Sequence, residues 1–470
     1  MELALLIDFG STYTKVTCAD MQNETIVGTA RAFSTVETGI MEGFLKALRD
    51  LEGSAGLSSP PYKYKFACSS AAGGLRLVAV GLIPDLTVEA AKRAALGAGA
   101  RVIGVYAHEL TGAEVGKIEG QRPDIILLAG GTDGGNKDVM IHNAGMLAGM
   151  HLEVPVIVAG NKSAAEQVKA ILEKGGKDVR VTANVMPELN VLNIDPARET
   201  IREVFLEKIV AAKGLKTAEE YIDRVLMPTP AAVLNAAELL ARGYGEEQGL
   251  GDLVVVDVGG ATTDVHSLAA GEPTKAGISW KGLPEPFAKR TVEGDLGMRY
   301  SAQALLEAAG VQRLARICRL PADEIVGYVE KVGSNPDLLC SDDISRTVDD
   351  AMAYTAVDLA VERHVGKIDV IYTPFGASYI QTGKDLTEVK YVIGTGGVIV
   401  FHPDPGLIMK GTLFDQARPA VLKPINPQLL IDRQYIMAGM GLLAEVDPVA
   451  SLRIMKKYLE EIHIEQGRML

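Results

Sequence analysis

The stretch LALLIDFGSTYTK (residues 3–15) joins a short apolar run to the sequence Asp-x-Gly and a turn rich in Ser and Thr. The segment DLVVVDVGGATTD (residues 252–264) repeats this design in the second half of the chain. A continuous apolar run of this length that ends in a glycine turn is typical of a strand buried on both faces. The residues that match in the two copies are Asp8 with Asp257, Gly10 with Gly259, and Thr14 with Thr263. The repeat predicts a duplicated domain.

A second recurrence points the same way. IILLAGGTDGG (125–135) and YVIGTGGVI (391–399) are each an apolar run followed by paired glycines, and each follows one of the Asp loops. We therefore predict that these two strands are twins. The polar, Gly-rich stretch at 242–252 separates the copies, so we predict one domain over residues 1–250 and another over 251–470. The second would carry a helical insertion at about 295–365 and a helix near its end.

Strands and helices are expected to alternate, which indicates an α/β class. Further expected strands cover residues 65–68, 155–159, 253–256 and 370–372, each read as buried on both faces. Expected helices cover residues 36–52, 87–96, 163–174, 198–212, 345–364 and 451–466.

The composition is that of a folded protein with an acidic surface. The 470 residues are 47% apolar and carry a formal net charge of −13. Such a surface repels phosphate backbones and anionic lipids, so binding to nucleic acid or to a membrane surface is disfavoured. No apolar run is long enough for a signal peptide or a membrane span. The four cysteines form no Cys-x-x-Cys pair, which favours a reducing compartment, and we expect a cytosolic protein.

The two Asp loops have the features of phosphate sites. Small residues after a strand let several backbone amides approach one anion. The expected donors are Gly10, Ser11, Thr12, Tyr13, Thr14 and Lys15 in the first loop, and Gly259, Gly260, Ala261, Thr262 and Thr263 in the second. Asp8 and Asp257 could hold Mg²⁺, because this ion prefers hard oxygen ligands and retains part of its water shell. The structural alternative is that each loop is only a tight hairpin turn.

These motifs resemble those of the superfamily that contains actin, sugar kinases and heat-shock chaperones. DFGSTYTK resembles its phosphate-1 motif, DVGGATTD its phosphate-2 motif and YVIGTGGVI its adenosine motif. The resemblance implies two ribonuclease-H-like (actin-like ATPase) domains with an interdomain nucleotide cleft. The nucleoside would then lie against the backbone of Gly394, Gly396 and Gly397. No Gly-x-x-x-x-Gly-Lys-Ser/Thr sequence is present, so the Walker alternative fails.

Two further segments resemble parts of the chaperones. MPTPAAVLNAAELLARG (227–243) is similar to their interdomain hinge helix, and TVEGDLGMRYS (291–301), with Gly294, to a glycine-rich loop. The chaperones carry an acidic residue before the hinge proline, whereas this chain has Met227. The residue that positions the attacking water must therefore lie elsewhere. Asp133 and Asp264 are catalytic candidates, together with Asp8 and Asp257, although both also fit turn or capping carboxylates.

Nearly the whole chain resembles one family, the GlmL or MutL-type accessory proteins of adenosylcobalamin-dependent mutases. TVEGDLGMRYS, ANVMPELNVLN and ILLAGGTDGGNKD carry this resemblance. It implies a chaperone-like factor that uses ATP and Mg²⁺ to release damaged cobalamin from a mutase such as glutamate mutase or an aminomutase. A small-molecule kinase and an actin-like scaffold protein are the alternatives within the superfamily. The sequence leaves open the client, the oligomeric state (a homo-oligomer included) and whether hydrolysis or binding alone drives function.

Overall fold

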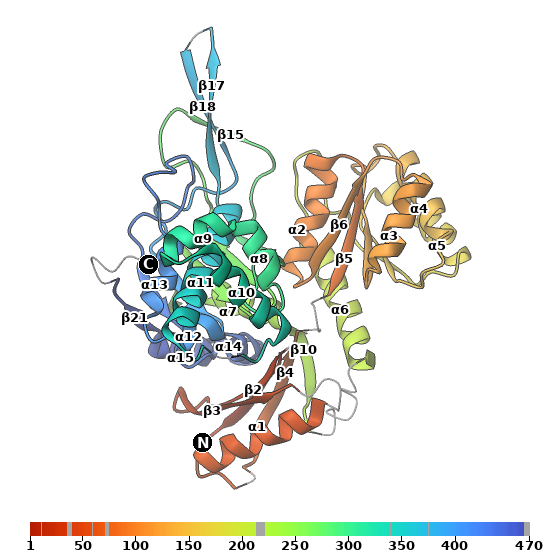
Figure 1. The fold of residues 1–470 in the computed structure, drawn as a ribbon. Coiled ribbons are helices and arrows are strands. Elements are labelled where there is room, and N and C mark those ends of the chain that lie inside the picture. The colour runs from red at the N-terminus through yellow and green to blue at the C-terminus, as the bar shows by residue number, and fades with distance from the viewer. Residues whose placement is uncertain are drawn as a thin grey trace. The chain divides into compact units, whose positions relative to one another are not determined.

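The computed structural model describes residues 1–10, 12–34, 40–58, 60–70, 75–212, 221–338, 340–374 and 376–464 (Figure 1). The chain divides into two compact units. Leu3–Cys18 and Ala30–Ala232 form the N-terminal unit, and Met1–Glu2, Ala19–Thr29 and Val233–Leu470 form the C-terminal unit. Helix α7 (Thr229–Arg242) carries the chain from the first unit into the second.

The first Asp loop belongs to a five-stranded sheet of order β10-β4-β1-β2-β3. Its central strand β1 pairs in parallel with β4, and β4 pairs in parallel with β10. All seven residues of β1 are buried, Asp8 among them, which agrees with the apolar run over residues 3–7. The strands are β1 (Leu3–Phe9), β2 (Tyr13–Asp20), β3 (Thr25–Phe33), β4 (Tyr62–Ser69) and β10 (Arg224–Pro228). Helix α1 (Ile40–Ser54) buries one face, from which Phe44 contacts Phe9.

The second Asp loop belongs to a six-stranded sheet of order β16-β14-β13-β19-β20-β21. Strand β13 is antiparallel to β14 and parallel to β19, and β14 is antiparallel to β16. The strands are β13 (Leu253–Val258), β14 (Thr263–Leu268), β16 (Ala288–Glu293), β19 (Tyr391–Thr395), β20 (Gln428–Ile431) and β21 (Glu460–Ile462). From neighbour to neighbour across the sheet, β16-β14-β13-β19-β20 repeats the order β3-β2-β1-β4-β10, and the matching strands follow one another in the same order along the chain. The predicted duplication of a ribonuclease-H-like α/β domain is thereby confirmed.

One predicted pair of twins is wrong. The strand of IILLAGGTDGG, β7 (Ile125–Leu128), does not lie in the sheet of β1. By strand order the twin of β19 is β4, which pairs with β1 as β19 pairs with β13. An apolar run followed by glycines marks the end of many buried parallel strands, and the pattern does not say to which sheet the strand belongs.

Strand β7 lies instead in a separate parallel sheet inserted between β4 and β10, of order β6-β5-β7-β8-β9. Its core includes Val78, Ile126, Val156, Ala144 and Val168. The other strands are β5 (Arg76–Gly81), β6 (Arg101–Ala107), β8 (Val156–Val158) and β9 (Val179–Val181). The helices are η1 (Pro84–Val88), α2 (Glu89–Gly97), α3 (Gly112–Gln121), α4 (Asp138–Ala148), α5 (Lys162–Lys174) and α6 (Asp195–Ala212).

Between β16 and β17 the chain forms four helices, α8 (Ala302–Ala309), α9 (Val311–Cys318), α10 (Ala322–Ser334) and α11 (Asp343–His364), and β17 belongs to a three-stranded sheet. That sheet has the order β15-β18-β17, with β15 (Ile278–Lys281), β17 (Lys367–Thr373) and β18 (Gly376–Thr382). In Figure 1 the hairpin β17–β18 extends away from the body of its unit. Residues 370–372 form a strand as predicted, but their predicted burial is wrong, because Tyr372 is 84% exposed.

Short elements complete the C-terminal unit. They are β11 (Gly243–Tyr244), β12 (Glu247–Gln248), α12 (Gly397–Val400), α13 (Pro405–Met409), η3 (Lys410–Thr412), α14 (Met437–Leu443) and α15 (Pro448–Tyr458). The helix predicted over residues 451–466 ends earlier, at Tyr458, and strand β21 follows. Strand β21 pairs with β20, and this pairing competes successfully with continuation of the helix.

Candidate nucleotide-binding loops

The first Asp loop is a tight turn that requires glycine. The Gly10 amide donates hydrogen bonds to the carbonyls of Asp8 and Tyr13, at 3.0 and 3.1 Å. A Cβ atom at Gly10 would lie 2.4 Å from the Tyr13 carbonyl oxygen, so no larger residue fits this backbone. The Tyr13 ring stacks on Phe33 with centroids 4.6 Å apart, and Ser11 lies outside the described residues. Thr12 accepts a backbone hydrogen bond from Ser34.

The second Asp loop repeats the same turn. The Gly259 amide donates to the Thr262 carbonyl at 2.9 Å, which is the counterpart of the bond from Gly10 to Tyr13. Within the described part of the chain, the amides of Gly260, Ala261 and Thr262 have no acceptor. All three residues are partly exposed. This loop therefore has three hydrogen-bond donors available to an anion.

The glycine-rich segment 294–301 donates hydrogen bonds to the carbonyls of the second loop. The Ser301 hydroxyl donates to the carbonyls of Ala261 and Gly294, at 2.8 and 2.9 Å. The amides of Met298 and Arg299 donate to the carbonyls of Gly259 and Gly260. Because the loop's carbonyls are occupied in this way, its backbone is held while its amides stay available.

The Arg299 side chain forms an ion pair with another part of the same unit. Its guanidinium forms a two-point ion pair with Asp349 of α11, at 2.8 and 3.0 Å. Burial alone would lower the pKa of Arg299, but its hydrogen bonds and ion pair with Asp349 raise it. Arg299 thus anchors the segment 294–301 to α11.

The predicted adenosine loop touches the second aspartate. Gly396 has a φ of 88°, and a Cβ atom there would lie 2.5 Å from Oδ1 of Asp257. Asp257 is also the register partner of Thr395 across β13 and β19. A Cβ atom at Gly397 would make only an ordinary contact with the Phe401 ring, at 3.9 Å, whereas Gly394 is packed against Met409, Ile399 and Ile431. Gly396 therefore lies against the Asp257 carboxylate, and Gly394 serves packing.

Three side chains from different elements surround the Asp8 carboxylate. Lys15 of β2 donates to Oδ2 at 2.8 Å, and Thr229, the first residue of α7, donates to Oδ1 at 2.6 Å. The Cys68 thiol, near the end of β4, lies 3.6 Å from the same Oδ1. Burial and the neighbouring Asp8 charge raise the pKa of Cys68 well above its ordinary value, so this sulfur stays a thiol.

Asp264 lies in β14 and pairs with Arg290 of β16, whose Nε donates to its Oδ1 at 2.8 Å. Thr262 donates to its other oxygen at 3.1 Å. Asp264 is thus a partner of a buried arginine, and it braces the second loop through Thr262.

Asp133 follows β7 in the inserted sheet, a different sheet from that of Asp8. It accepts hydrogen bonds from the Lys162 amide and from Asn184, both at 3.0 Å. Burial would raise its pKa, but these hydrogen bonds and the Lys162 charge hold it below the ordinary value. These contacts hold the glycine-rich loop after β7 in place.

The threonines that end both loops are fully buried. Thr14 contacts the Ser34 hydroxyl at 3.2 Å, and Thr263 donates to the Leu296 carbonyl at 2.7 Å. Their hydroxyls are therefore occupied inside the strands, and in the second loop the available donors are the amides of Gly260, Ala261 and Thr262.

Cys68 and Thr229 are the residues that sequence reasoning missed. Cys68 ends a strand that was recognised, and Thr229 stands in the hinge segment. They meet Asp8 because β1, β4 and β10 are parallel neighbours whose carboxyl ends share one edge. The signal that could have found them is a polar residue at the end of each parallel strand.

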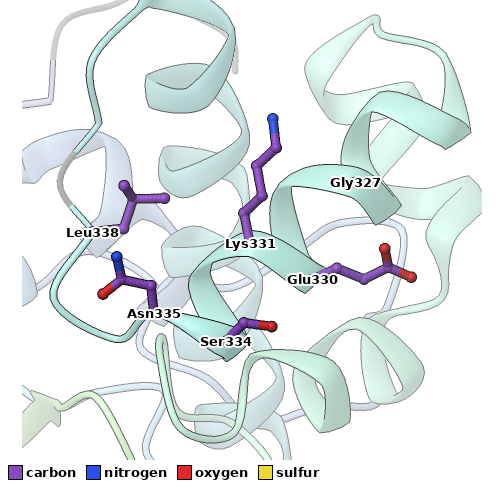
Figure 2. A pocket seen from close by; sticks show the side chains of 6 residues that line it. All are labelled: Gly327, Glu330, Lys331, Ser334, Asn335 and Leu338. Carbon is purple, nitrogen blue, oxygen red and sulfur yellow. The ribbon is translucent and has the colours of Figure 1, made fainter.

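A separate surface pocket lies away from both loops in sequence. It has a volume of about 590 Å³ and is lined by residues on and just after α10: Gly327, Glu330, Lys331, Ser334, Asn335 and Leu338. In Figure 2 the Glu330 and Lys331 side chains point in different directions.

Among the described residues, no three or more His, Cys, Asp or Glu side chains are grouped to hold a metal ion. No helix in the same residues is long and apolar enough to cross a membrane.

Comparisons with known proteins cover nearly the whole chain. Two solved structures show weak likeness in fold. The activator of the 2-hydroxyisocaproyl-CoA dehydratase from Clostridium difficile with bound ADPNP is 10% identical, with a TM-score of 0.33 and coverage of 98% of this chain and 99% of that one. The xylulose kinase from Bifidobacterium adolescentis is 12% identical, with a TM-score of 0.34 and coverage of 99% and 96%.

The sequence comparisons are closer. Protein MutL from Clostridium tetanomorphum is 54% identical over 462 residues, which cover 98% of this chain and 100% of that protein. The family described as MutL protein matches residues 4–459. The chain therefore belongs to the MutL protein family.

Proposed function

We propose that this protein binds ATP with Mg²⁺ through its two Asp loops and uses slow ATP hydrolysis to remodel an adenosylcobalamin-dependent mutase. The observation that carries the nucleotide part is the repeated turn. The bonds from Gly10 to Tyr13 and from Gly259 to Thr262 occur at matching places in two sheets of the same strand order. A structural hairpin needs no such repetition. The mutase part rests on the family resemblance, and membership of the MutL family supports it.

The residues present fit a magnesium ion held largely through water. Asp8 and Asp257 offer hard carboxylate oxygens at the ends of matching strands. Both oxygens of Asp8 already accept hydrogen bonds, from Lys15 and Thr229, so this carboxylate suits a water-mediated contact. When bound, the ion would neutralise phosphate charge.

The loop backbones would hold the nucleotide itself. The amides of Gly260, Ala261 and Thr262 would donate to phosphate oxygens, and the backbone of Gly396 and Gly397, which carries no side chain, would face the nucleoside. Lys15 would add one positive charge near the first loop. These contacts suit ATP better than a nucleotide without a γ-phosphate, since they are mostly contacts to phosphate.

Hydrolysis would proceed by in-line attack of water on the γ-phosphorus, with cleavage of its bond to the bridging oxygen of ADP. Backbone amides that do not need to reorganise would stabilise the charge that develops on the phosphoryl oxygens. Loss of the γ-phosphate then removes contacts that distinguish the ATP-bound state, and this difference is the free energy available for remodelling a client.

The nucleotide part is tested by Asp8→Ala and Asp257→Ala. Each is expected to abolish Mg²⁺-dependent ATP hydrolysis while the protein still unfolds cooperatively in urea. Asp8→Ala should lower the urea midpoint, because it removes a buried carboxylate that accepts hydrogen bonds from Lys15 and Thr229. The matched control is Asp252→Ala, which removes an exposed aspartate next to β13 and should hydrolyse ATP normally. Normal hydrolysis in both loop variants would overturn the assignment of the site.

The client part is tested with a purified adenosylcobalamin-dependent mutase inactivated by cyanocobalamin. The protein with ATP and Mg²⁺ is expected to release the cyanocobalamin and restore activity once adenosylcobalamin is supplied, and the Asp257→Ala variant should not. No release, with a phosphorylated small molecule as product, would indicate a kinase instead. ATP-dependent pelleting in place of release would indicate a filament protein.

A further inference from the structure

The Asp8 carboxylate is held more firmly than a metal-binding role alone would need. Its side chain is only 7% exposed. Lys15, Thr229 and Cys68 approach it from β2, α7 and β4, with Lys15 at Oδ2 and the other two at Oδ1. Because these contacts come from three elements, they fix both the position and the rotation of the carboxylate.

Thr229 is the strongest of the contacts to Oδ1. Its Oγ1 lies 2.6 Å from Asp8 Oδ1 and 3.6 Å from the Cys68 sulfur. A hydroxyl that donates to a carboxylate makes a charge-assisted hydrogen bond, which is stronger than a neutral one. The neighbouring Met227 is buried and apolar, and the Thr229 hydroxyl donates a hydrogen bond from this segment to Asp8.

The place of Thr229 in the chain gives this bond a second consequence. Thr229 is the first residue of α7, and the chain leaves the N-terminal unit within that helix, between Ala232 and Val233. A change in the orientation of Asp8 would therefore act directly on the first turn of the helix that links the units.

We propose that Thr229 and Cys68 are positioning residues for Asp8, and that Thr229 couples the state of Asp8 to the first turn of α7. This inference rests on the proposed Mg²⁺–ATP site. Asp8 would hold the ion through water, Thr229 would keep the carboxylate in the orientation for that contact, and the same hydrogen bond would hold the start of α7. Cys68 supports the orientation of Oδ1 from the β4 side.

The test compares Thr229→Val, which keeps the shape and removes the hydroxyl, with Thr229→Ser, which keeps the hydroxyl. Binding of a fluorescent ATP analogue is titrated with and without Mg²⁺. Thr229→Val is expected to weaken Mg²⁺-dependent binding about tenfold, the scale of one charge-assisted bond, and to leave metal-free binding unchanged. Thr229→Ser should bind like the wild type. The control Thr200→Val removes a threonine hydroxyl in α6 of the same unit and should have no effect.

Hydrogen exchange gives a readout that a merely structural role would not move. Adding Mg²⁺ and the ATP analogue should slow exchange at Ala231–Leu234 in the wild type and in Thr229→Ser, but not in Thr229→Val. Cys68→Ala should weaken Mg²⁺-dependent binding by about threefold, because a thiol is a weak donor. It also tests the cluster if Thr229→Val does not fold.

Wild-type affinity and wild-type exchange protection in Thr229→Val would overturn the positioning role, while the proposed function would stand. A wild-type protein without Mg²⁺-dependent affinity for the analogue would instead overturn the proposed function, and the positioning role with it. Equal loss in Thr229→Val and Thr229→Ser would show that the hydroxyl is not the group that matters.

Discussion

At the scale of single residues, Gly396 is where the backbone most clearly excludes a side chain beside the candidate site. Its φ of 88° is unfavourable for any residue with a Cβ, and that atom would meet both Asp257 and the backbone of Val258. Gly277 has a similar φ of 82° but open space around it. An alanine at Gly277 would therefore add backbone strain alone, whereas an alanine at Gly396 would add both backbone strain and a steric clash.

Gly396→Ala is expected to weaken binding of Mg²⁺–ATP by about tenfold or more, because Asp257 or the loop must shift to admit the methyl group. Gly277→Ala carries similar strain, about 1–2 kcal/mol of stability, but should bind ATP like the wild type. Nucleotide titration and urea unfolding measure the two effects. Equal affinities in both variants would show that Gly396 is not part of the site.

Two buried histidines make stability depend on pH. Burial, and then the Arg290 charge, lower the pKa of His266 from 6.5 to about 3. Burial also lowers the pKa of His364 well below 6.5, with smaller effects from Lys289 and Lys384. Both imidazoles are therefore neutral in the folded protein at pH values where the unfolded chain would bind a proton.

Because both folded-state pKa values lie below those of the unfolded chain, neither histidine destabilises the fold above pH 6.5, and the unfolding free energy falls as the pH drops below that value. For His266 this fall continues to about pH 3. Each histidine adds about 1.4 kcal/mol per pH unit to that loss. His266→Gln is expected to reduce the slope of unfolding free energy against pH by about this amount. The control is His151→Gln at an exposed position. An unchanged slope in His266→Gln would contradict the conclusion that the pKa of His266 is lowered in the folded state.

The sequence is sufficient to predict the tight turns that follow Asp8 and Asp257, because each turn is formed by residues that lie close together in the chain. It does not predict that Cys68 and Thr229 contact Asp8. They reach Asp8 only through the register of β1, β4 and β10, and register depends on pairings over long distances in the chain.

At the scale of elements, apolar strands of similar composition have different environments. Leu253–Val256 of β13 are fully buried, whereas Val370 and Ile371 of β17 are 46% and 45% exposed. Strand β13 lies in the middle of its sheet, and β17 lies at the edge of a three-stranded one. A short apolar run predicts a strand reliably, but the number of sheet faces that are covered depends on what packs there.

The same substitution made in both strands tests this difference. Val254→Thr places a hydroxyl in the core and is expected to cost about 1–3 kcal/mol of unfolding free energy. Val370→Thr should change it by about 0.5 kcal/mol or less, because the side chain is half exposed and threonine favours strands. Urea unfolding measures both values, and equal costs would mean that the β17 face is covered in solution.

At the scale of the whole molecule, the repeated Asp-loop pattern predicted the duplication, and the strand order of the two sheets confirms it. What the pattern could not show is the extra parallel sheet within the first copy. Its strands carry the same signals as those of the duplicated sheets, so the sequence pattern predicts the wrong twin for β7. Chain connectivity alone does not reveal that β10 returns to the first sheet after residues 76–212 have formed another.

The inserted sheet has the properties of an independent domain. Strands β5 to β9 pair in parallel with one another, and β5, β7 and β8 form the centre of a core with α4 and α5. Helix α6 packs against α2 of the same insertion, as well as against β10. A fragment of residues 75–212 thus keeps every strand pairing of its sheet and lies within the usual range of domain sizes.

This fragment is expected to fold alone and to unfold cooperatively in urea, with coincident transitions in far-UV circular dichroism and in intrinsic tyrosine fluorescence. The matched fragment of residues 75–194 lacks α6 and so exposes the face of α2 that α6 covers. It should be less stable or fail to fold, because apolar surface removed from water by that packing is returned to it. A broad, non-cooperative transition in the longer fragment would show that the inserted sheet depends on β10 and the rest of the chain for its structure.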